Sequence, residues 1–194
     1  MNPPRLVLAS TSPYRRELLA RLRLPFDVEP PGVDEAALAG ETARDTALRL
    51  AQAKARAVAA KFSRALVIGS DQVAALDGER LGKPGSHERA VAQLKAMRGR
   101  TVLFYTALAL LNSASGAIQT AEVPTEVRFR DYSEREIERY LEIERPYDCS
   151  GSAKIEGLGI VLVERVSGDD PSALIGLPLV RLVAMLRNEG VTIV

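Results

Sequence analysis

The chain has 194 residues, of which 46% are hydrophobic and 26% are charged, a balance typical of a water-soluble protein with a real core. Its 26 Lys and Arg residues nearly cancel its 25 Asp and Glu residues, which argues against general binding to nucleic acid or to an anionic membrane. One Cys and one His exclude an internal disulfide framework and argue against a Cys/His zinc site. Without a long apolar stretch for a membrane span, we expect a cytoplasmic α/β protein.

Apolar periodicity and cap signals predict helices and strands that alternate along the chain. In the first half we expect a strand at 6–10, a helix from 13 that Pro25 closes, a loop at 30–35, a helix at 42–60 and a strand at 65–68. Further on we expect an Asp77–Gly78 turn, extended chain at 81–84, a helix at 86–98, strands at 102–111 and 125–129, a helix at 133–144, a strand at 159–166, a helix at 178–187 and a strand at 191–194. This order predicts one mixed α/β unit that is bilobal.

Asp71 is the most informative candidate for catalysis. The apolar strand at 65–68 ends abruptly in Gly69, Ser70 and Asp71, and ligands of open α/β sheets bind outside strand ends. The alternative is a loop aspartate that satisfies nearby backbone donors. Glu35 is a second candidate carboxylate, although by itself it is typical of an exposed residue. Because Mg²⁺ takes one or two carboxylates together with substrate phosphates, Glu35 and Asp71 are candidate metal ligands, or a ligand and a base.

The start of the first helix is the clearest anion site. Ser10 and Ser12 offer hydroxyls and backbone N–H groups at the positive end of a helix, and Ser12 precedes Pro13 as an N-cap. Arg15 and Arg16 follow within the first turn, where a guanidinium can hold phosphate oxygens. The alternative is an ordinary cap followed by two solvated arginines. Helical spacing cannot direct both arginines to one point.

The sequence context favours a functional role for some of the other reactive side chains and not for others. Lys83 stands between Gly82 and Pro84, where the constrained backbone favours a functional cation. Lys54 lies among alanines of a helix, a setting typical of a surface lysine. Cys149 has no evident activating neighbour and is expected to be a small buried residue, while His87 is expected to be a solvated first-turn residue.

The segment 148–159 is rich in small residues that let a backbone approach a ligand closely. It lacks the glycine fingerprint of dinucleotide-binding folds, and the chain has no P-loop motif. The sequence therefore argues against a P-loop NTPase and against a Rossmann dehydrogenase.

Six blocks in the chain resemble the Maf family, in family order and over nearly the whole length. They are LASTSPYRRELL (8–19), IGSDQ (68–72), LGKP (81–84), MRG (97–99), DCSGSAKIEGLG (148–159) and GDDPSALIGLPL (168–179). The resemblance implies a nucleoside triphosphate pyrophosphatase that cleaves between the α- and β-phosphates. It also implies a single two-lobed domain over 1–194 with a mixed twisted sheet, flanking helices and a central cleft, of the ITPase-like kind.

The resemblance further implies a divalent cation such as Mg²⁺, Mn²⁺ or Co²⁺, and a homodimer. Asp71 matches the residue that the family uses as proton acceptor. Five more residues match positions that line the family's cleft as phosphate or metal contacts: Ser10, Arg15, Glu35, Lys54 and Lys83. For Lys54 and Glu35 this role rests on the resemblance alone.

Three positions separate substrate classes within the family, and here they hold Tyr14, Gln72 and Glu156. This set resembles the subgroup that acts on 7-methyl-GTP rather than the one that acts on dTTP and UTP. Chemistry supports it, because Glu156 can accept from the N1–H and amino group of guanine and Tyr14 can stack on a cationic methylated base. The subgroup often has Trp where this chain has Tyr14.

Three alternatives stay open at this point. A dTTP/UTP pyrophosphatase would keep the reaction and change the base. A non-catalytic nucleotide sensor that inhibits septum formation would bind substrate without turnover. A general phosphatase would release orthophosphate instead of pyrophosphate. The sequence leaves the physiological substrate and the preferred metal undecided.

Overall fold

A computed structural model describes residues 4–194 of the chain. Its seven strands form one sheet in the order β2-β1-β3-β5-β6-β7, with β4 paired to β3 outside this path. The strands are β1 (Arg5–Ala9), β2 (Asp27–Val28), β3 (Ala65–Leu76), β4 (Glu79–Leu81), β5 (Thr101–Asn112), β6 (Ile118–Phe129) and β7 (Val163–Gly168). Strand β1 runs parallel to β2 and β3, whereas the other pairs are antiparallel, so the predicted mixed sheet is confirmed.

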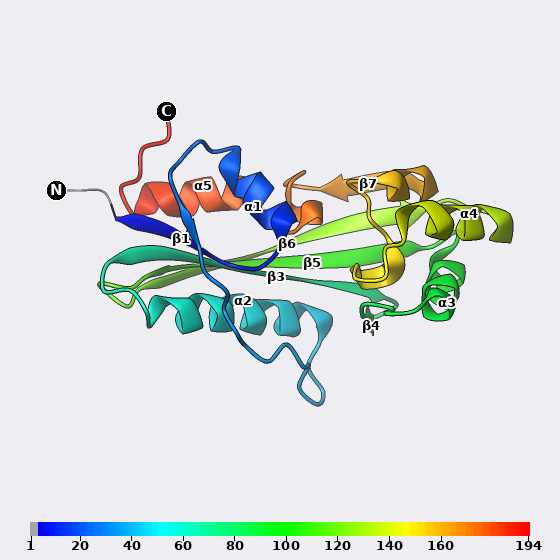
Figure 1. Cartoon of the computed structure of the whole chain (residues 1–194), viewed down its shortest axis with the longest axis horizontal. Helices are drawn as coiled ribbons and strands as arrows, with labels where there is room; N and C mark the ends of the chain where they lie inside the picture. The colour runs from blue at the N-terminus through cyan, green and yellow to red at the C-terminus, as the bar shows by residue number, and fades with distance from the viewer. Residues whose placement is uncertain (1–3) are drawn as a thin grey trace.

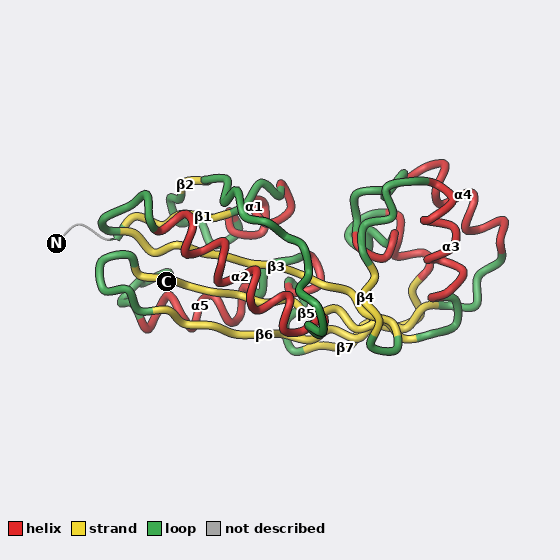
Figure 2. The backbone as a smooth tube through the Cα atoms, turned by 90° about the horizontal axis from the view of Figure 1, so that it is seen from below, coloured by secondary structure: helices red, strands yellow, loops and turns green. Residues whose placement is uncertain are grey.

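Five α-helices flank the sheet: α1 (Pro13–Ala20), α2 (Ala43–Ala59), α3 (His87–Met97), α4 (Glu134–Glu144) and α5 (Leu179–Asn188). Three short 3-10 helices accompany them: η1 (Ser150–Ser152), η2 (Leu158–Leu162) and η3 (Ala173–Ile175). At one end of the long strands, α2 covers one face of the sheet and α1 and α5 cover the other, while α3 and α4 gather at the opposite end (Figures 1 and 2). None of the helices in residues 4–194 has the length and apolarity needed to cross a membrane.

The apolar core divides in the same way as the helices. Alternating residues of β3 serve opposite faces, with Leu66 and Ile68 in the cluster under α1 and α5 and Val67 in the cluster under α2. A third cluster joins α3 and α4 to the far ends of the strands. The long strands β3, β5 and β6 thus connect two separately packed ends, which produces the predicted bilobal arrangement (Figure 2).

Predictions that rest on local cap chemistry are confirmed. The side chains of Ser12, Thr42, Ser86 and Ser133 each accept a hydrogen bond from the backbone N–H three residues later. At Ser133 the partner is Glu136, whose side chain bonds back to the cap, so the predicted capping box is present.

The predicted end of a strand at Asp71 is wrong. Strand β3 continues to Leu76, which places Asp71 in its middle. The polar residues do not end the strand because tertiary contacts satisfy them. The Ser70 hydroxyl, for example, lies 2.8 Å from the Ala107 carbonyl oxygen and 2.9 Å from that of Gly176.

Two further strand predictions are corrected. The first part of the segment 159–166 forms η2, and the strand begins at Val163. The Gly159 N–H bonds the Lys154 carbonyl, and the backbone of Lys154 lies so close that no side chain would fit at Gly159. The residues 191–194 form no strand; Val191 and Ile193 instead pack against the cluster under α1 and α5. The short strand β2 was not predicted, and β6 begins earlier than the predicted 125.

Candidate functional site

A cleft of about 640 Å³ opens between the two ends of the molecule. Strand β1 pairs with β3 only through Gly69, and β4 pairs with β3 only from Ala74 onward. Within residues 4–194, the intervening stretch 70–73 therefore has a strand on one side only, that of β5. The cleft lies against this open edge, since Asp71, Gln72 and Val73 line it. The gap in the sheet explains why a residue in mid-strand can reach a ligand.

A buried lysine joins two carboxylates in the cleft. The Lys54 Nζ atom lies 2.6 Å from Asp71 Oδ1 and 2.6 Å from Glu35 Oε1. Lys54 is only 4% exposed and Asp71 7%, whereas Glu35 stands on an exposed segment. The interpretation of Lys54 as a surface lysine is wrong. Its placement in the cleft agrees with the one that the family resemblance implied.

Small residues on α2 bring Lys54 to the strand. The alanines of this helix form the buried face that packs on the sheet, and they do not surround a solvated lysine. A side chain at Gly69 of β3 would collide with the backbone of Ala51, so the helix and the strand approach unusually closely. Lys54 lies one turn further along α2 than Ala51 and reaches Asp71 from there.

Burial and charge act in opposite directions on the two carboxylates. Burial raises the pKa of Asp71 above its ordinary value, and Lys54 and Arg15 only partly oppose this rise. Partial burial also opposes ionisation of Glu35, but Lys54, Lys83 and Arg15 outweigh it and lower the pKa of that carboxyl. Burial thus makes Asp71 a stronger base than an ordinary aspartate, as suits a proton acceptor.

Of the two arginines in the predicted anion site, only Arg15 lines the cleft. Ser10 is buried, and its hydroxyl oxygen accepts from the Ser12 N–H at 3.1 Å. Arg15 lines the cleft, where its Nε donates to the Gly176 carbonyl at 2.8 Å. Burial lowers the pKa of Arg15, while the charges of Asp71 and Glu35 oppose the shift. Arg16 is exposed, does not line the cleft, and faces a shallow surface depression beside Phe26, so it does not join Arg15.

Two cations complete the far wall of the cleft. Lys83 lines it, as the sequence predicted, and remains exposed. Arg80 also lines it and donates to the Thr46 hydroxyl at 2.9 Å. Sequence reasoning missed Arg80, whose only signal was its position just after the Asp77–Gly78 turn.

The three predicted specificity residues, Tyr14, Gln72 and Glu156, all line the cleft. Glu156 is exposed as a whole, and partial desolvation of its carboxyl group raises its pKa above the ordinary value. Lys154, which sequence reasoning did not single out, holds its Nζ 5.7 Å from the centre of the Tyr14 ring and 2.7 Å from Glu144 Oε1. The face of the Tyr14 ring therefore lies beside a cationic group.

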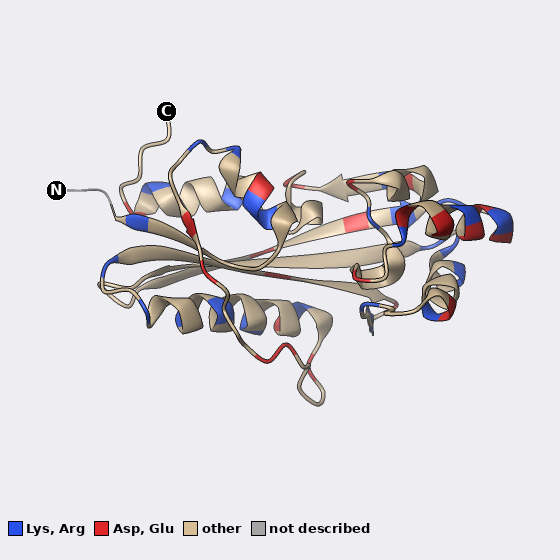
Figure 3. Ribbon diagram, viewed as in Figure 1, with Lys and Arg blue, Asp and Glu red and all other residues tan. Residues whose placement is uncertain are grey.

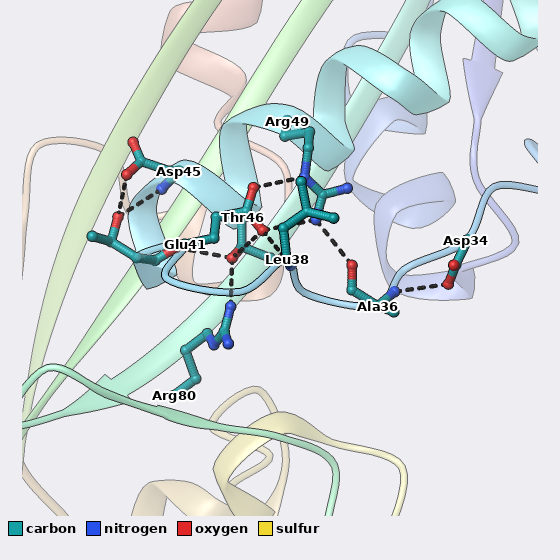
Figure 4. A network of polar contacts seen from close by, with 9 residues as sticks. Asp34, Ala36, Leu38, Glu41, Asp45, Thr46, Arg49 and Arg80 are labelled. Atoms are coloured by element: carbon teal, nitrogen blue, oxygen red, sulfur yellow. Dashed lines mark hydrogen bonds and ion pairs between the residues drawn. The ribbon is translucent and has the colours of Figure 1, made fainter.

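The segment that carries Glu35 is held by an acidic anchor, Glu41. The Glu41 carboxylate accepts from Arg49 Nε at 2.6 Å and from the Leu38 N–H at 3.1 Å, and Arg49 also donates to the Ala36 carbonyl at 3.0 Å (Figure 4). The hydroxyl of Thr46 joins Glu41 to Arg80 in the same network (Figure 4). This network connects the segment of Glu35 to Thr46 and Arg80, which line the cleft.

Replacing Glu41 with Gln is expected to remove a pH-dependent part of the stability. Arg49 lowers the pKa of Glu41 to about 2. The stabilisation is therefore present above the ordinary pKa of the carboxyl and disappears as the pH falls toward 2. Urea unfolding at pH 7 and at pH 3 should show a smaller pH difference in Glu41→Gln than in the wild type. Equal differences in the two proteins would contradict the anchor role.

Neither Cys149 nor His87 is arranged as a catalytic group, although Cys149 lines the cleft. Burial raises the pKa of the half-buried Cys149 thiol to about 12, so it stays protonated at neutral pH. His87 contacts Tyr147 at 3.1 Å and Glu138 at 2.8 Å and does not line the cleft. His87 lies in the first turn of α3 as expected, whereas Cys149 is less buried than expected.

Within residues 4–194, no group of three or more His, Cys, Asp and Glu side chains could hold a metal ion by itself. The carboxylate oxygens of Glu35 and Asp71 still lie close together, because both contact the Lys54 ammonium group. That donor set fits a hard cation such as Mg²⁺, which takes one or two carboxylates and completes its shell with phosphate oxygens and water.

Comparison of the sequence with models of known families identifies one family. The sequence model of a family described as "Maf-like protein" matches residues 5–189. The 7-methyl-GTP pyrophosphatase of Thiobacillus denitrificans is 62% identical over 190 residues, which cover 98% of this chain and 94% of the relative. The enzyme of the same name from Methylobacillus flagellatus is 58% identical over 98% of this chain and 100% of its own length. Among solved structures, the Staphylococcus aureus Ham1 protein is similar over 66% of this chain and 72% of its own, with 18% identity and a TM-score of 0.47.

Proposed function

This chain belongs to the Maf family, and from that premise we propose that it hydrolyses 7-methyl-GTP to 7-methyl-GMP and pyrophosphate. Its relatives over nearly the whole chain carry the name 7-methyl-GTP pyrophosphatase. The observation that carries the proposal is the buried pair of Lys54 and Asp71 at the open edge of β3, beside Arg15 and Glu35. The corresponding biological role is to remove this modified nucleotide from the cell's pool of nucleotides.

Asp71 takes the proton of the attacking water in this proposal. The water oxygen bonds to the α-phosphorus, the bond from that phosphorus to the bridging oxygen breaks, and pyrophosphate leaves. Lys54 holds Asp71 in place at 2.6 Å and favours its ionised form, which counteracts the burial. A carboxylate whose pKa is raised by burial is a stronger base than one in water.

The charge of the triphosphate is matched by the cations along the cleft. Arg15 and Lys83 can bind phosphate oxygens, and Ser10 can donate its hydroxyl, all from the walls of one cavity. Glu35 and Asp71 would hold a divalent cation, Mg²⁺, Mn²⁺ or Co²⁺, together with the phosphates. When bound, such an ion stabilises the negative charge that develops there.

Selection of the base falls to Tyr14, Gln72 and Glu156. Glu156 can accept from the two donors on the pairing edge of guanine. The Tyr14 ring, which already lies near the Lys154 ammonium, can face the positive charge of a 7-methylated ring instead. Uracil and thymine offer one N–H between two carbonyls, so Glu156 would meet an oxygen beside it.

Product analysis tests this function. The purified protein is incubated with 7-methyl-GTP, GTP, dTTP, UTP or CTP, with Mg²⁺ or Mn²⁺ and with a chelator. We expect pyrophosphate release that favours 7-methyl-GTP and stops with the chelator. A preference for dTTP or UTP would keep the reaction and refute the base assignment. Orthophosphate as the product, or binding without turnover, would instead favour a general phosphatase or a nucleotide sensor linked to septum formation.

We also propose that the protein acts in the cytoplasm as a homodimer. The single Cys suits a reducing compartment, and the dimer rests on the resemblance to the family. Acidic and basic residues are interspersed along α4 (Figure 3), and the two kinds nearly balance over the whole chain. That mixture supports a small nucleotide as the partner rather than nucleic acid.

A further inference from the structure

The amide nitrogen of Gln72 is surrounded by hydrogen-bond acceptors. Its Nε2 lies 2.9 Å from the Thr106 hydroxyl oxygen and 3.0 Å from the carbonyl oxygens of both Ala173 and Leu174. Both carbonyls belong to η3. Because side chains alternate along β3, Gln72 and these carbonyls lie on the opposite face of the strand from Asp71 and Lys54. The side chain is thus attached to a segment about 100 residues away along the chain.

These contacts determine which way the carboxamide points. A carbonyl oxygen can only accept, so the group that faces Ala173 and Leu174 must be the NH₂ end. The opposite orientation would place the Gln72 Oε1 against two carbonyl oxygens. Gln72 also lines the cleft, and Oε1 is the polar end that its amide contacts leave for a ligand. A glutamine that could turn freely would donate or accept, but this one presents only an acceptor.

Thr106 secures this orientation. It is fully buried in β5, and its hydroxyl oxygen accepts from Gln72 while its proton is donated to the Ala173 carbonyl at 2.9 Å. The hydroxyl therefore joins the amide and one of its carbonyl partners. Thr106 itself does not line the cleft, so it can act on a ligand only through Gln72.

The segment that supplies the carbonyls is itself fixed to the fold. The buried Asp170 carboxylate accepts from the Ser172 hydroxyl at 2.6 Å and from the Val180 N–H at 2.8 Å at the start of α5. At the other end of η3, the Gly176 carbonyl accepts from Ser70 at 2.9 Å. The carbonyls near Gln72 therefore hold their positions relative to β3.

We propose that Thr106 is a positioning residue that, together with the Ala173 and Leu174 carbonyls, holds Gln72 as an acceptor and so selects bases that carry hydrogen-bond donors on their pairing edge. The inference rests on the proposed function and deepens it. With Glu156, the cleft then offers two acceptors to the base. Guanine supplies an N1–H and an amino group to them, whereas uracil and thymine supply one N–H and direct two carbonyl oxygens toward them.

The test compares Thr106→Val with Thr106→Ser, which keeps the hydroxyl. We expect Thr106→Val to lower the ratio of kcat/KM for 7-methyl-GTP over UTP by about tenfold, the scale of one well-formed hydrogen bond. The loss should fall mainly on KM, because Asp71 and Lys54 lie on the other face of β3. Thr106→Ser should retain most of the selectivity. If Thr106→Val does not fold, Thr106→Ala removes the same hydroxyl with less crowding.

A second readout does not depend on turnover. The side-chain NH₂ of Gln72, assigned in ¹⁵N–¹H spectra by its absence in Gln72→Ala, should exchange slowly with solvent in the wild type and in Thr106→Ser, and faster in Thr106→Val. Equal losses for both nucleotides with unchanged exchange, or a serine variant as impaired as the valine variant, would overturn the inference. If the wild type releases no pyrophosphate from any nucleotide, the proposed function is refuted instead. The exchange rates would still test whether Thr106 holds the Gln72 amide in place.

Discussion

Asp71→Asn is expected to lower pyrophosphate release by roughly 10²–10⁴-fold, the usual contribution of a general base. Asparagine has nearly the same shape and can still accept a hydrogen bond from Lys54, which lies 2.6 Å from the carboxylate in the wild type. It cannot take a proton from water. Since Glu35 also pairs with Lys54, the lysine keeps one anionic partner and the variant should fold.

The matched control is Asp169→Asn, the same chemical change at an exposed position outside the cleft. Initial rates with 7-methyl-GTP and the thermal unfolding midpoint should be measured for both variants. We expect Asp169→Asn to match the wild type in both measurements. Near-normal turnover of a folded Asp71→Asn would remove Asp71 from the role of proton acceptor.

Lys54→Met is expected to cost more stability than any other single change in the cleft. Removing one partner of a buried ion pair typically costs about 3–5 kcal/mol, because the remaining charge has no compensation. Asp71 has Lys54 as its one ion-pair partner within residues 4–194, so its carboxylate would be left buried beside methionine. Burial would then raise the pKa of Asp71 further and leave less of the basic form, so turnover should fall as well.

Urea unfolding at pH 7 measures the loss of stability, with Lys61→Met as the control. Lys61 is also a lysine near the end of α2, but its ion pair with Glu29 is solvent-exposed, and such pairs contribute about 0–1 kcal/mol. Similar unfolding free energies for the two variants would contradict the view that Lys54 compensates a buried charge. Full activity of Lys54→Met would exclude it from the proposed mechanism.

The burial of Lys54 could not be predicted from the sequence. Its neighbours in α2 are alanines, and on a helix that pattern fits a buried face and a solvated face equally well. The choice depends on Gly69, which lets the helix approach the strand, and on a carboxylate 17 residues further along the chain. Neither contact can be inferred from the local pattern.

The end of β3 shows the same limit. Gly69, Ser70 and Asp71 are typical of a strand end, yet β3 continues to Leu76 because partners from β5 and η3 satisfy Ser70 and Gln72. Propensity is a weak guide where tertiary contacts compensate it. Arg15 and Arg16 were equivalent by sequence, and only the packing of α1 separated the arginine in the cleft from the one at the surface.

The sequence by itself determined the features whose physical causes lie within a few residues: the capped helix starts, the alternation of β3 between two cores, and the balance of charge. Its motifs also identified the family and most of the cleft's lining. The tertiary structure alone decided the burial of Lys54, the exclusion of Arg16 and the orientation of Gln72. These properties depend on partners between 17 and 161 residues away, whose proximity arises only when the helices pack on the sheet.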